Sequence, residues 1–186
     1  MTCAEDGFAA ETAAHTAAFL LLKAGRAVSR ETLGHWLYLA EREHAKLRGH
    51  AIFDDTWLAT EDGQTCHHAL RGLAGLSEHR VWAQTFATSK NELSQCRDDV
   101  TLDSLDHLSE AIIITCDTIL RQYGACSDEN LVDLIRYLPE NRIFKGNNTQ
   151  IGAHAMALSV GLKNPDAFVE MNAESRSIRR CFADIV

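Results

Sequence analysis

The stretch SRETLGHWLYLAEREHAKLRG, residues 29–49, predicts the central helix of the fold. Ser29 is a suitable N-cap, and Glu31 lies in the first turn, where a carboxylate interacts favourably with the helix dipole. Apolar residues recur on one stripe at helical spacing: Leu33, Trp36, Leu37, Ala40 and Leu47. The opposite, solvated face carries Glu41, Arg42, Glu43 and Lys46. Gly49 ends the helix, and we expect its tryptophan and the neighbouring leucine to be buried.

Helix signals dominate the rest of the chain as well. Ala and Leu are strong helix formers, and further segments show apolar repeats at three-or-four spacing. Ser127 can cap one of these helices, and Pro139 ends it. The expected helices cover residues 11–24, 67–73, 103–123, 127–138, 149–160 and 166–182. Residues 77–89 are expected to hold another short helix or a strand.

The segment after the central helix has a different character. Residues 51–60 combine aromatic and β-branched residues with a pair of aspartates, and Glu61-Asp-Gly marks a turn. The expected fold class is therefore mainly α: a single helical domain with a short β-hairpin, between residues 51 and 59, or a small sheet between the first and second helix groups. We expect a helical domain at 1–145, with a C-terminal helical extension at 146–186 packed on it.

Composition limits the function classes. The 186 residues are 46% hydrophobic and 24% charged, which is normal for a globular protein with a core. The formal net charge of −8 disfavours nucleic acid as a partner, because binding to phosphate backbones usually needs clustered Lys and Arg. The apolar run at 17–22 is too short to span a membrane. We expect a cytoplasmic protein whose six cysteines are reduced thiols.

The most suggestive local cluster for chemistry is Cys66-His67-His68, since thiolate and imidazole are good zinc ligands. Adjacent residues on a helix point in different directions, however, and no C-x-x-C pair provides a second half of a site. We therefore expect surface or turn residues here, with no metal, no cofactor and no catalytic residue. The prediction is that the protein is not an enzyme.

Other polar residues are assigned to the surface. The pairs Asp54-Asp55 and Glu61-Asp62 are interpreted as solvated loop carboxylates. His44 and His50 flank the end of the central helix, where an imidazolium is electrostatically favourable, and His35 is expected to be exposed. A basic cluster near the C-terminus is expected to form a solvated helix face: Arg176, Arg179 and Arg180.

Two stretches resemble the SocA-like, or Panacea, domain. The first is Leu37-Tyr-Leu-Ala-Glu-Arg-Glu-His, followed by Leu47-Arg-Gly-His and Phe53-Asp-Asp-Thr-Trp-Leu-Ala. The second runs from Leu108-Ser-Glu to Ile119-Leu-Arg-Gln-Tyr-Gly and on to Ser127-Asp-Glu-Asn-Leu-Val-Asp-Leu. The resemblance covers roughly residues 13 to 143. The family often has a Gly-Pro-Val turn where this chain has Gly63-Gln64-Thr65, and the segment from Gly146 onward has no counterpart in it.

This resemblance implies an antitoxin that binds and neutralises a cognate protein toxin. Some members of the family act as adaptors that deliver the toxin to an ATP-dependent protease such as ClpXP, and others sequester it. The family has no established catalytic residues. Two alternatives remain open: a phage or mobile-element regulator that binds another host protein, and a metal- or thiol-dependent enzyme that uses the Cys66–His68 region.

Within the family-like block, Phe53 and Trp57 lie at i and i+4 of the extended segment and would point to the same side of a strand. Aromatic residues are enriched in binding hot spots, although we expect at least one of the two to be core. The predicted partner-binding residues, chosen by their position in this block, are Phe53, Asp55, Trp57, Asp62, Gln64, His67 and His68.

Overall fold

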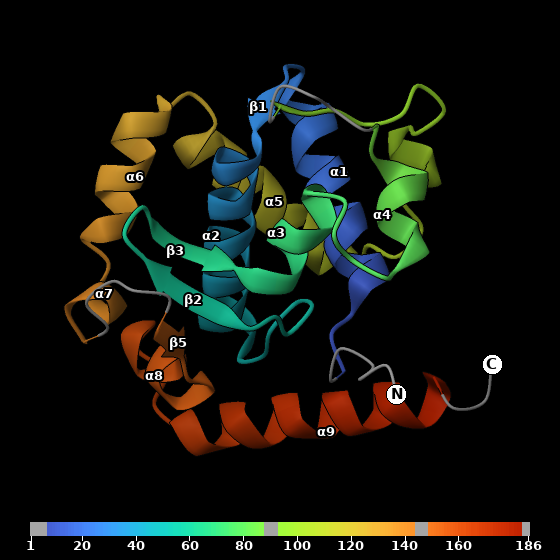
Figure 1. Ribbon diagram of the computed structural model, residues 1–186. Coiled ribbons are helices and arrows are strands. Elements are labelled where there is room, and N and C mark those ends of the chain that lie inside the picture. Colours follow the sequence, from blue (N-terminus) through green and yellow to red (C-terminus); the bar gives the residue numbers. More distant parts are fainter. Residues whose placement is uncertain (1–6, 88–92, 144–148, 184–186) are drawn as a thin grey trace.

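The computed structural model describes residues 7–87, 93–143 and 149–183 and is mainly helical, as expected (Figure 1). Its elements in chain order are α1 (Ala10–Ala24), β1 (Val28–Ser29), α2 (Arg30–Arg48), β2 (Trp57–Thr60), β3 (Gly63–Cys66), α3 (His67–Leu73), α4 (Arg80–Thr85), β4 (Leu93–Ser94), a 3-10 turn (Leu102–Ser104), α5 (Glu110–Tyr123), α6 (Asp128–Arg136), α7 (Pro139–Ile143), β5 (Thr149–Ile151), α8 (Ala153–Ser159) and α9 (Pro165–Ala183).

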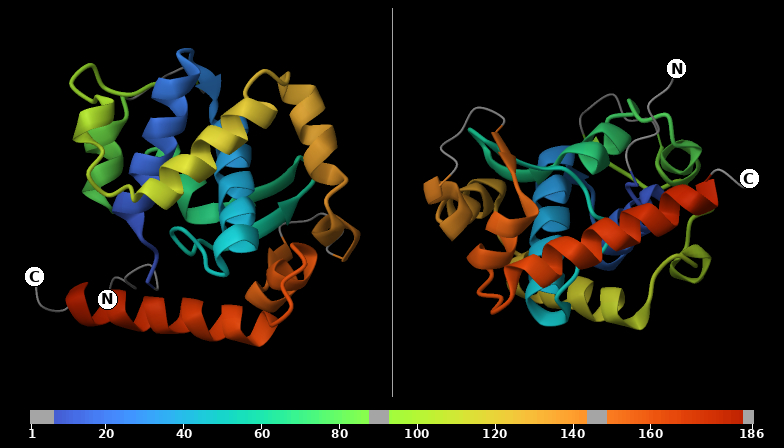
Figure 2. Two further views of the ribbon diagram at one scale, coloured as in Figure 1. Left: turned by 180° about the vertical axis from the view of Figure 1, so that it is seen from behind. Right: turned by 90° about the horizontal axis from the view of Figure 1, so that it is seen from below.

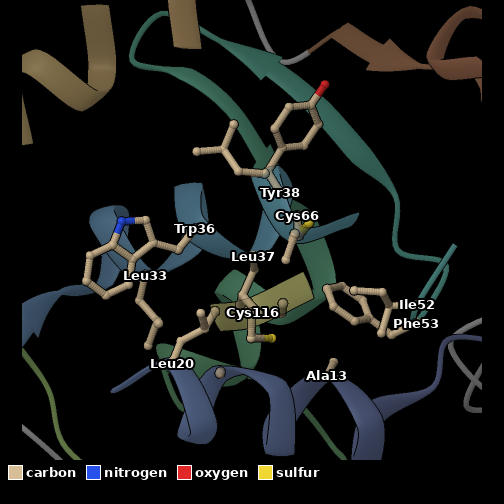
Figure 3. Packing of buried hydrophobic residues seen from close by; sticks show 14 of the residues in the cluster. Ala13, Leu20, Leu33, Trp36, Leu37, Tyr38, Ile52, Phe53, Cys66 and Cys116 are labelled. Atoms are coloured by element: carbon tan, nitrogen blue, oxygen red, sulfur yellow. The ribbon is translucent and has the colours of Figure 1, made fainter. Parts of the chain in front are cut away.

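The helix α2 lies at the centre of the molecule, between the hairpin β2–β3 on one side and α5 on the other (Figures 1 and 2). Its start is fixed by Ser29, whose hydroxyl accepts the backbone N–H of Thr32 at 3.0 Å, as predicted. Figure 3 shows Leu37 of α2 meeting Leu20 of α1 and Cys116 of α5. The apolar core therefore surrounds α2 and joins three helices.

Two residues of α2, Leu47 and Glu41, lie in surroundings that differ from those predicted. Leu47 was placed on the apolar stripe, yet its side chain is 56% exposed. Glu41 was expected on the solvated face, yet its side chain is fully buried, as are those of several polar neighbours on α2. A helix at the centre of a fold is enclosed on most sides, so its charged face does not identify a solvent face.

The main sheet has the strand order β3-β2-β5, and both pairings are antiparallel. The strands β2 and β3 form a hairpin with Trp57 opposite Cys66 and Thr60 opposite Gly63. The hairpin was expected between residues 51 and 59, but residues 51–56 form a loop and the turn predicted at Glu61-Asp-Gly connects the two strands. A second, two-stranded ladder pairs β1 with β4.

Two helix boundaries differ from the sequence expectation. The helix α5 was expected from residue 103 or 104, but it begins at Glu110, where the hydroxyl of Ser109 accepts the N–H of Ile112 at 3.4 Å. Leu105 and Leu108 continue the apolar spacing before this cap without being helical, because they pack on the core from a loop. Ser127 caps α6 as predicted, while Pro139 begins the short helix α7.

The C-terminal segment does more than pack on the rest of the fold. Residues 149–151, expected as the start of a helix, form β5 and add the third strand to the sheet. Ile151, Met156 and Phe168 are buried in the common core. The helix α9 agrees with its predicted range and runs along one side of the molecule (Figures 1 and 2). The segment thus supplies a strand and core residues as well as helices.

One close contact joins α3 to α4. The indole ring of Trp82 lies against the backbone of Gly72, so that a Cβ added at Gly72 would be 2.1 Å from a ring atom. Trp82 also stacks on Phe86, with the ring centroids 5.7 Å apart. The absence of a side chain at Gly72 is therefore a condition for this packing.

We expect the substitution Gly72→Ala to lower the free energy of unfolding by about 2–3 kcal/mol, because the added methyl group displaces a packed ring. Urea unfolding followed by far-UV circular dichroism measures this change. Gly152→Ala is the matched control, since Gly152 has an ordinary negative φ and nothing within 4 Å of the added Cβ. It should cost less than about 1 kcal/mol, and equal losses for the two variants would contradict the prediction.

Candidate functional site

The seven predicted partner-binding residues occupy the loop before β2, the hairpin and the start of α3. The side chains of Phe53, Asp55, Trp57 and Gln64 are buried, Asp62 is exposed at the hairpin turn, and His67 and His68 are half-buried. Asp55 and His68 are brought into contact, whereas Asp62 lies at the far end of the hairpin. Both aromatic residues belong to the core, and the binding role of the set stays a prediction.

The loop of residues 51–56 is organised by the buried carboxyl group of Glu41. Its Oε2 accepts the backbone N–H of Ile52 at 2.7 Å, and its Oε1 accepts those of Phe53 and Asp54 at 3.1 and 2.9 Å. Burial raises the pKa of Glu41 to about 8, while the N–H groups of Ile52 and Phe53 act to lower it. A single side chain of α2 thus holds three consecutive peptide units of the loop.

Asp54 continues this network to α9. Its φ of 58° is unusual for a residue other than glycine. Its buried carboxylate pairs with Arg176, whose Nη2 lies 2.8 Å from Oδ1, and with Arg179, whose Nη2 lies 3.2 Å from Oδ2. Arg179 also donates to the carbonyl oxygen of Gly7 at 2.6 Å. The basic cluster expected on a solvated face therefore includes two arginines that compensate a buried charge.

Asp55 performs a second structural task. Its Oδ1 accepts the N–H of His68 at 2.8 Å, and its Oδ2 accepts the N–H of Ala69 at 2.9 Å, so the carboxylate satisfies the first turn of α3. The expectation that Asp54 and Asp55 are solvated is wrong, because the loop turns both of them inward to donors. Glu61 and Asp62 are exposed, as expected.

A further buried contact connects α2 with α7 and α8. The hydroxyl of Tyr38 donates to Oε1 of Glu140 at 2.7 Å, and Arg42 Nε donates to the same oxygen at 2.9 Å. Arg42 also reaches the carbonyl oxygen of Ser159 at 3.3 Å. The sequence signal for this contact was weak, because Glu140 follows a proline in what reads as a turn.

The Cys66-His67-His68 cluster does not converge on one point. The thiol of Cys66 is fully buried, and burial, with Asp55 and Glu41 nearby, raises its pKa well above the usual value. Zinc binding and nucleophilic attack both need the thiolate, so this environment works against either use. The rings of His67 and His68 form a T-shaped pair with centroids 5.1 Å apart. Across the described residues, no group of three or more His, Cys, Asp or Glu side chains could hold a metal ion.

Two histidines of α2, His35 and His44, are buried. His44 Nδ1 lies 3.1 Å from the hydroxyl oxygen of Thr115 on α5, and its ring is 4.9 Å from that of His50. Burial, together with His50 and Arg48, lowers the pKa of His44 to about 4, so the imidazolium expected at His44 is wrong. His35 is also buried, with Nδ1 3.0 Å from the carbonyl oxygen of Gln64, and burial lowers its pKa.

A pocket of about 340 Å³ lies away from this network, between the end of α3, the start of α4 and β4. Trp82 and Phe86 line it on one side, and Leu93 and Ser94 line it on another. Sequence reasoning missed this site, because its residues come from four separate segments and share no motif. The aromatic pair on α4 was the available signal.

Comparison with protein-family models, with curated proteins and with solved structures finds no match for this chain. Among the helices within residues 7–87, 93–143 and 149–183, none is both long enough and apolar enough to cross a membrane.

We expect Glu41→Leu to lower the free energy of unfolding by about 3–5 kcal/mol, because three buried N–H groups lose their acceptor. Glu43→Leu on the same helix is the control, since Glu43 accepts no backbone N–H from outside α2 among the described residues and forms a 3.8 Å ion pair with Lys46. Its effect should stay below about 1 kcal/mol in the same urea titration. A Glu41 variant as stable as the control would contradict the role given to this carboxyl group.

The low pKa of His44 predicts a loss of stability in acid. The folded state takes up the proton near pH 4 and the unfolded state near pH 6.5, so the contribution of His44 is fully present above pH 6.5 and is lost as the pH falls to about 4. The variant His44→Asn, which cannot be charged, should lose about 2 kcal/mol less than the parent chain between pH 7 and pH 4.

Urea unfolding at a series of pH values measures the difference, in which other titrating groups cancel. Gln84→Asn is the control, since Gln84 is exposed on α4 and neither side chain titrates, so the pH dependence should be unchanged. If the parent and His44→Asn lose the same free energy, the buried neutral imidazole does not limit acid stability.

Proposed function

We propose that this chain is a cytoplasmic antitoxin of the SocA-like (Panacea) kind, which binds and neutralises a protein toxin. The observation that carries the proposal is that the two family-like stretches, far apart in sequence, form one structural unit. His44, at the end of the first stretch, contacts Thr115 in the second at 3.1 Å. Thr32, which precedes the first stretch on the same helix α2, donates to Asp128 in the second stretch at 2.7 Å. If the two stretches specify the same fold here and in the SocA-like family, the similar order of their residues is explained.

The polar residues of the block also support a binding role over a catalytic one. Glu41 is bound to the loop, Asp54 to α9 and Asp55 to α3. These carboxyl groups have their hydrogen-bonding capacity occupied within the fold, and none lines the pocket beside Trp82. A rigid scaffold of this kind presents its surface to a partner while its signature residues hold the shape.

Co-expression with the product of the neighbouring gene tests the proposal. We expect the neighbour alone to stop growth and the pair to restore growth to that of cells with an empty vector. We also expect the two proteins to co-purify. An unrelated toxin expressed with this chain is the control and should remain toxic. No complex and no rescue of growth would overturn the proposal, and a host protein recovered in place of a toxin would favour a mobile-element regulator.

The adaptor function is separable from sequestration. If the chain delivers its toxin to a ClpXP-type protease, deleting the protease restores toxicity while the complex still forms. If the chain sequesters the toxin, growth remains rescued without the protease. The steady-state level of the toxin, measured by immunoblotting in both strains, distinguishes the two modes.

A further inference from the structure

The pocket between α3, α4 and β4 has an aromatic wall. Trp82 on α4 and Phe86, the residue that follows the end of α4, stack with an interplanar angle of 24°. Trp82 is held in place by its contact with Gly72, which also lines the pocket. At about 340 Å³ the pocket lies at the small end of the range for ligand sites, roughly 300–1,000 Å³. It therefore has room for one or two large side chains.

Two residues that line the pocket each have a buried polar atom with no hydrogen-bond partner among the described residues: Nε1 of Trp82 and Oγ of Ser94. The two residues are only 3% and 5% exposed. A buried donor or acceptor without a partner costs about 1–3 kcal/mol, and such groups are rare in native proteins. Two such atoms therefore occur in residues that line one pocket.

Two exposed leucines lie at the pocket. Leu93, which lines the pocket, is 43% exposed, and Leu76 is exposed between the lining residues Gly75 and Ser77. Exposed apolar side chains around a desolvated aromatic centre are the arrangement found at protein-binding hot spots. These leucines therefore favour a protein segment over a small polar metabolite.

The charge at the pocket is opposite to that of the chain. The lining includes the cations Arg30 and Arg80, the single carboxylate Glu78, and His79. The whole chain carries a formal net charge of −8, so this is a locally basic position on an acidic protein. Arg80 is exposed and has no ion-pair partner in the part of the chain that the structure describes. A carboxylate on a partner would complement this position electrostatically.

We infer that this pocket docks a partner-protein segment that inserts one large apolar side chain beside Trp82 and Phe86 and places an Asp or Glu carboxylate against Arg80. The inference rests on the proposed protein-binding function and names the chemistry of the partner at this surface. The stacked rings provide the apolar contact. The guanidinium group of Arg80 selects partner segments in which an acidic residue lies close to the apolar one.

The test uses the full chain and a displayed library of random 12-residue peptides. We expect the selected peptides to share a large apolar residue followed closely by Asp or Glu. Fluorescence anisotropy then measures their affinity for the parent chain and for Arg80→Glu and Leu93→Asp, each of which should weaken binding at least tenfold. Replacing the acidic residue of the peptide by its amide should weaken binding about as much as Arg80→Glu does.

Two matched variants control for general effects of charge. Arg121→Glu alters an exposed arginine on α5, and Leu102→Asp alters a leucine that is 46% exposed, close to the exposure of Leu93. Neither residue lines the pocket, so both variants should bind the peptides with unchanged affinity. Thermal unfolding of each variant verifies that it is folded.

The outcomes separate this inference from the antitoxin proposal. A library that yields no apolar–acidic pattern, or peptides that bind Arg80→Glu and Leu93→Asp as tightly as the parent, overturns the pocket. If the toxin is neutralised equally well by those two variants, the antitoxin proposal stands and the pocket inference fails. If the peptides bind at the pocket but no neighbouring toxin is bound, the pocket stands and serves a different partner protein.

Discussion

A carboxyl group inside the molecule determines how the chain passes from α2 to β2. Glu41 accepts three consecutive N–H groups, those of Ile52, Phe53 and Asp54. The Asp54 carboxylate pairs with two arginines of α9. The Asp55 carboxylate accepts an N–H group in the first turn of α3. The loop is therefore a junction at which a helix from each third of the chain meets. Apolar packing alone would not specify this junction, because hydrophobic contacts are not directional.

Much of the fold follows from local signals. Ser29 and Ser127 cap helices at the predicted positions, and α1, α3 and α9 agree with their expected ranges to within a few residues. These signals are reliable because capping and periodicity depend on residues only a few positions apart. The same locality explains the error at α5, where the apolar spacing continues through Leu108 even though the chain is not helical there.

The parts that could not be predicted depend on residues distant in sequence. Glu41 reads as a solvent-facing residue, and its burial is possible only because a loop more than ten positions later brings donors to it. Arg176 and Arg179 read as a surface cluster until Asp54 is placed opposite them. The pocket beside Trp82 is the extreme case, since four segments create it and none of them carries a recognisable motif. Most of the predicted partner-binding residues are buried in the loop before β2 or in the hairpin β2–β3.

Because β5 pairs with β2, the main sheet is completed only after the C-terminal part of the chain has been synthesised. The hairpin leaves the ribosome long before Thr149–Ile151, and protein synthesis proceeds at about 5–20 residues per second. For several seconds, one edge of β2 and the ring of Trp57 have neither the third strand nor Phe168 to cover them. A nascent chain with an open strand edge is prone to wrong pairing, so the last quarter of the sequence also protects the part made before it.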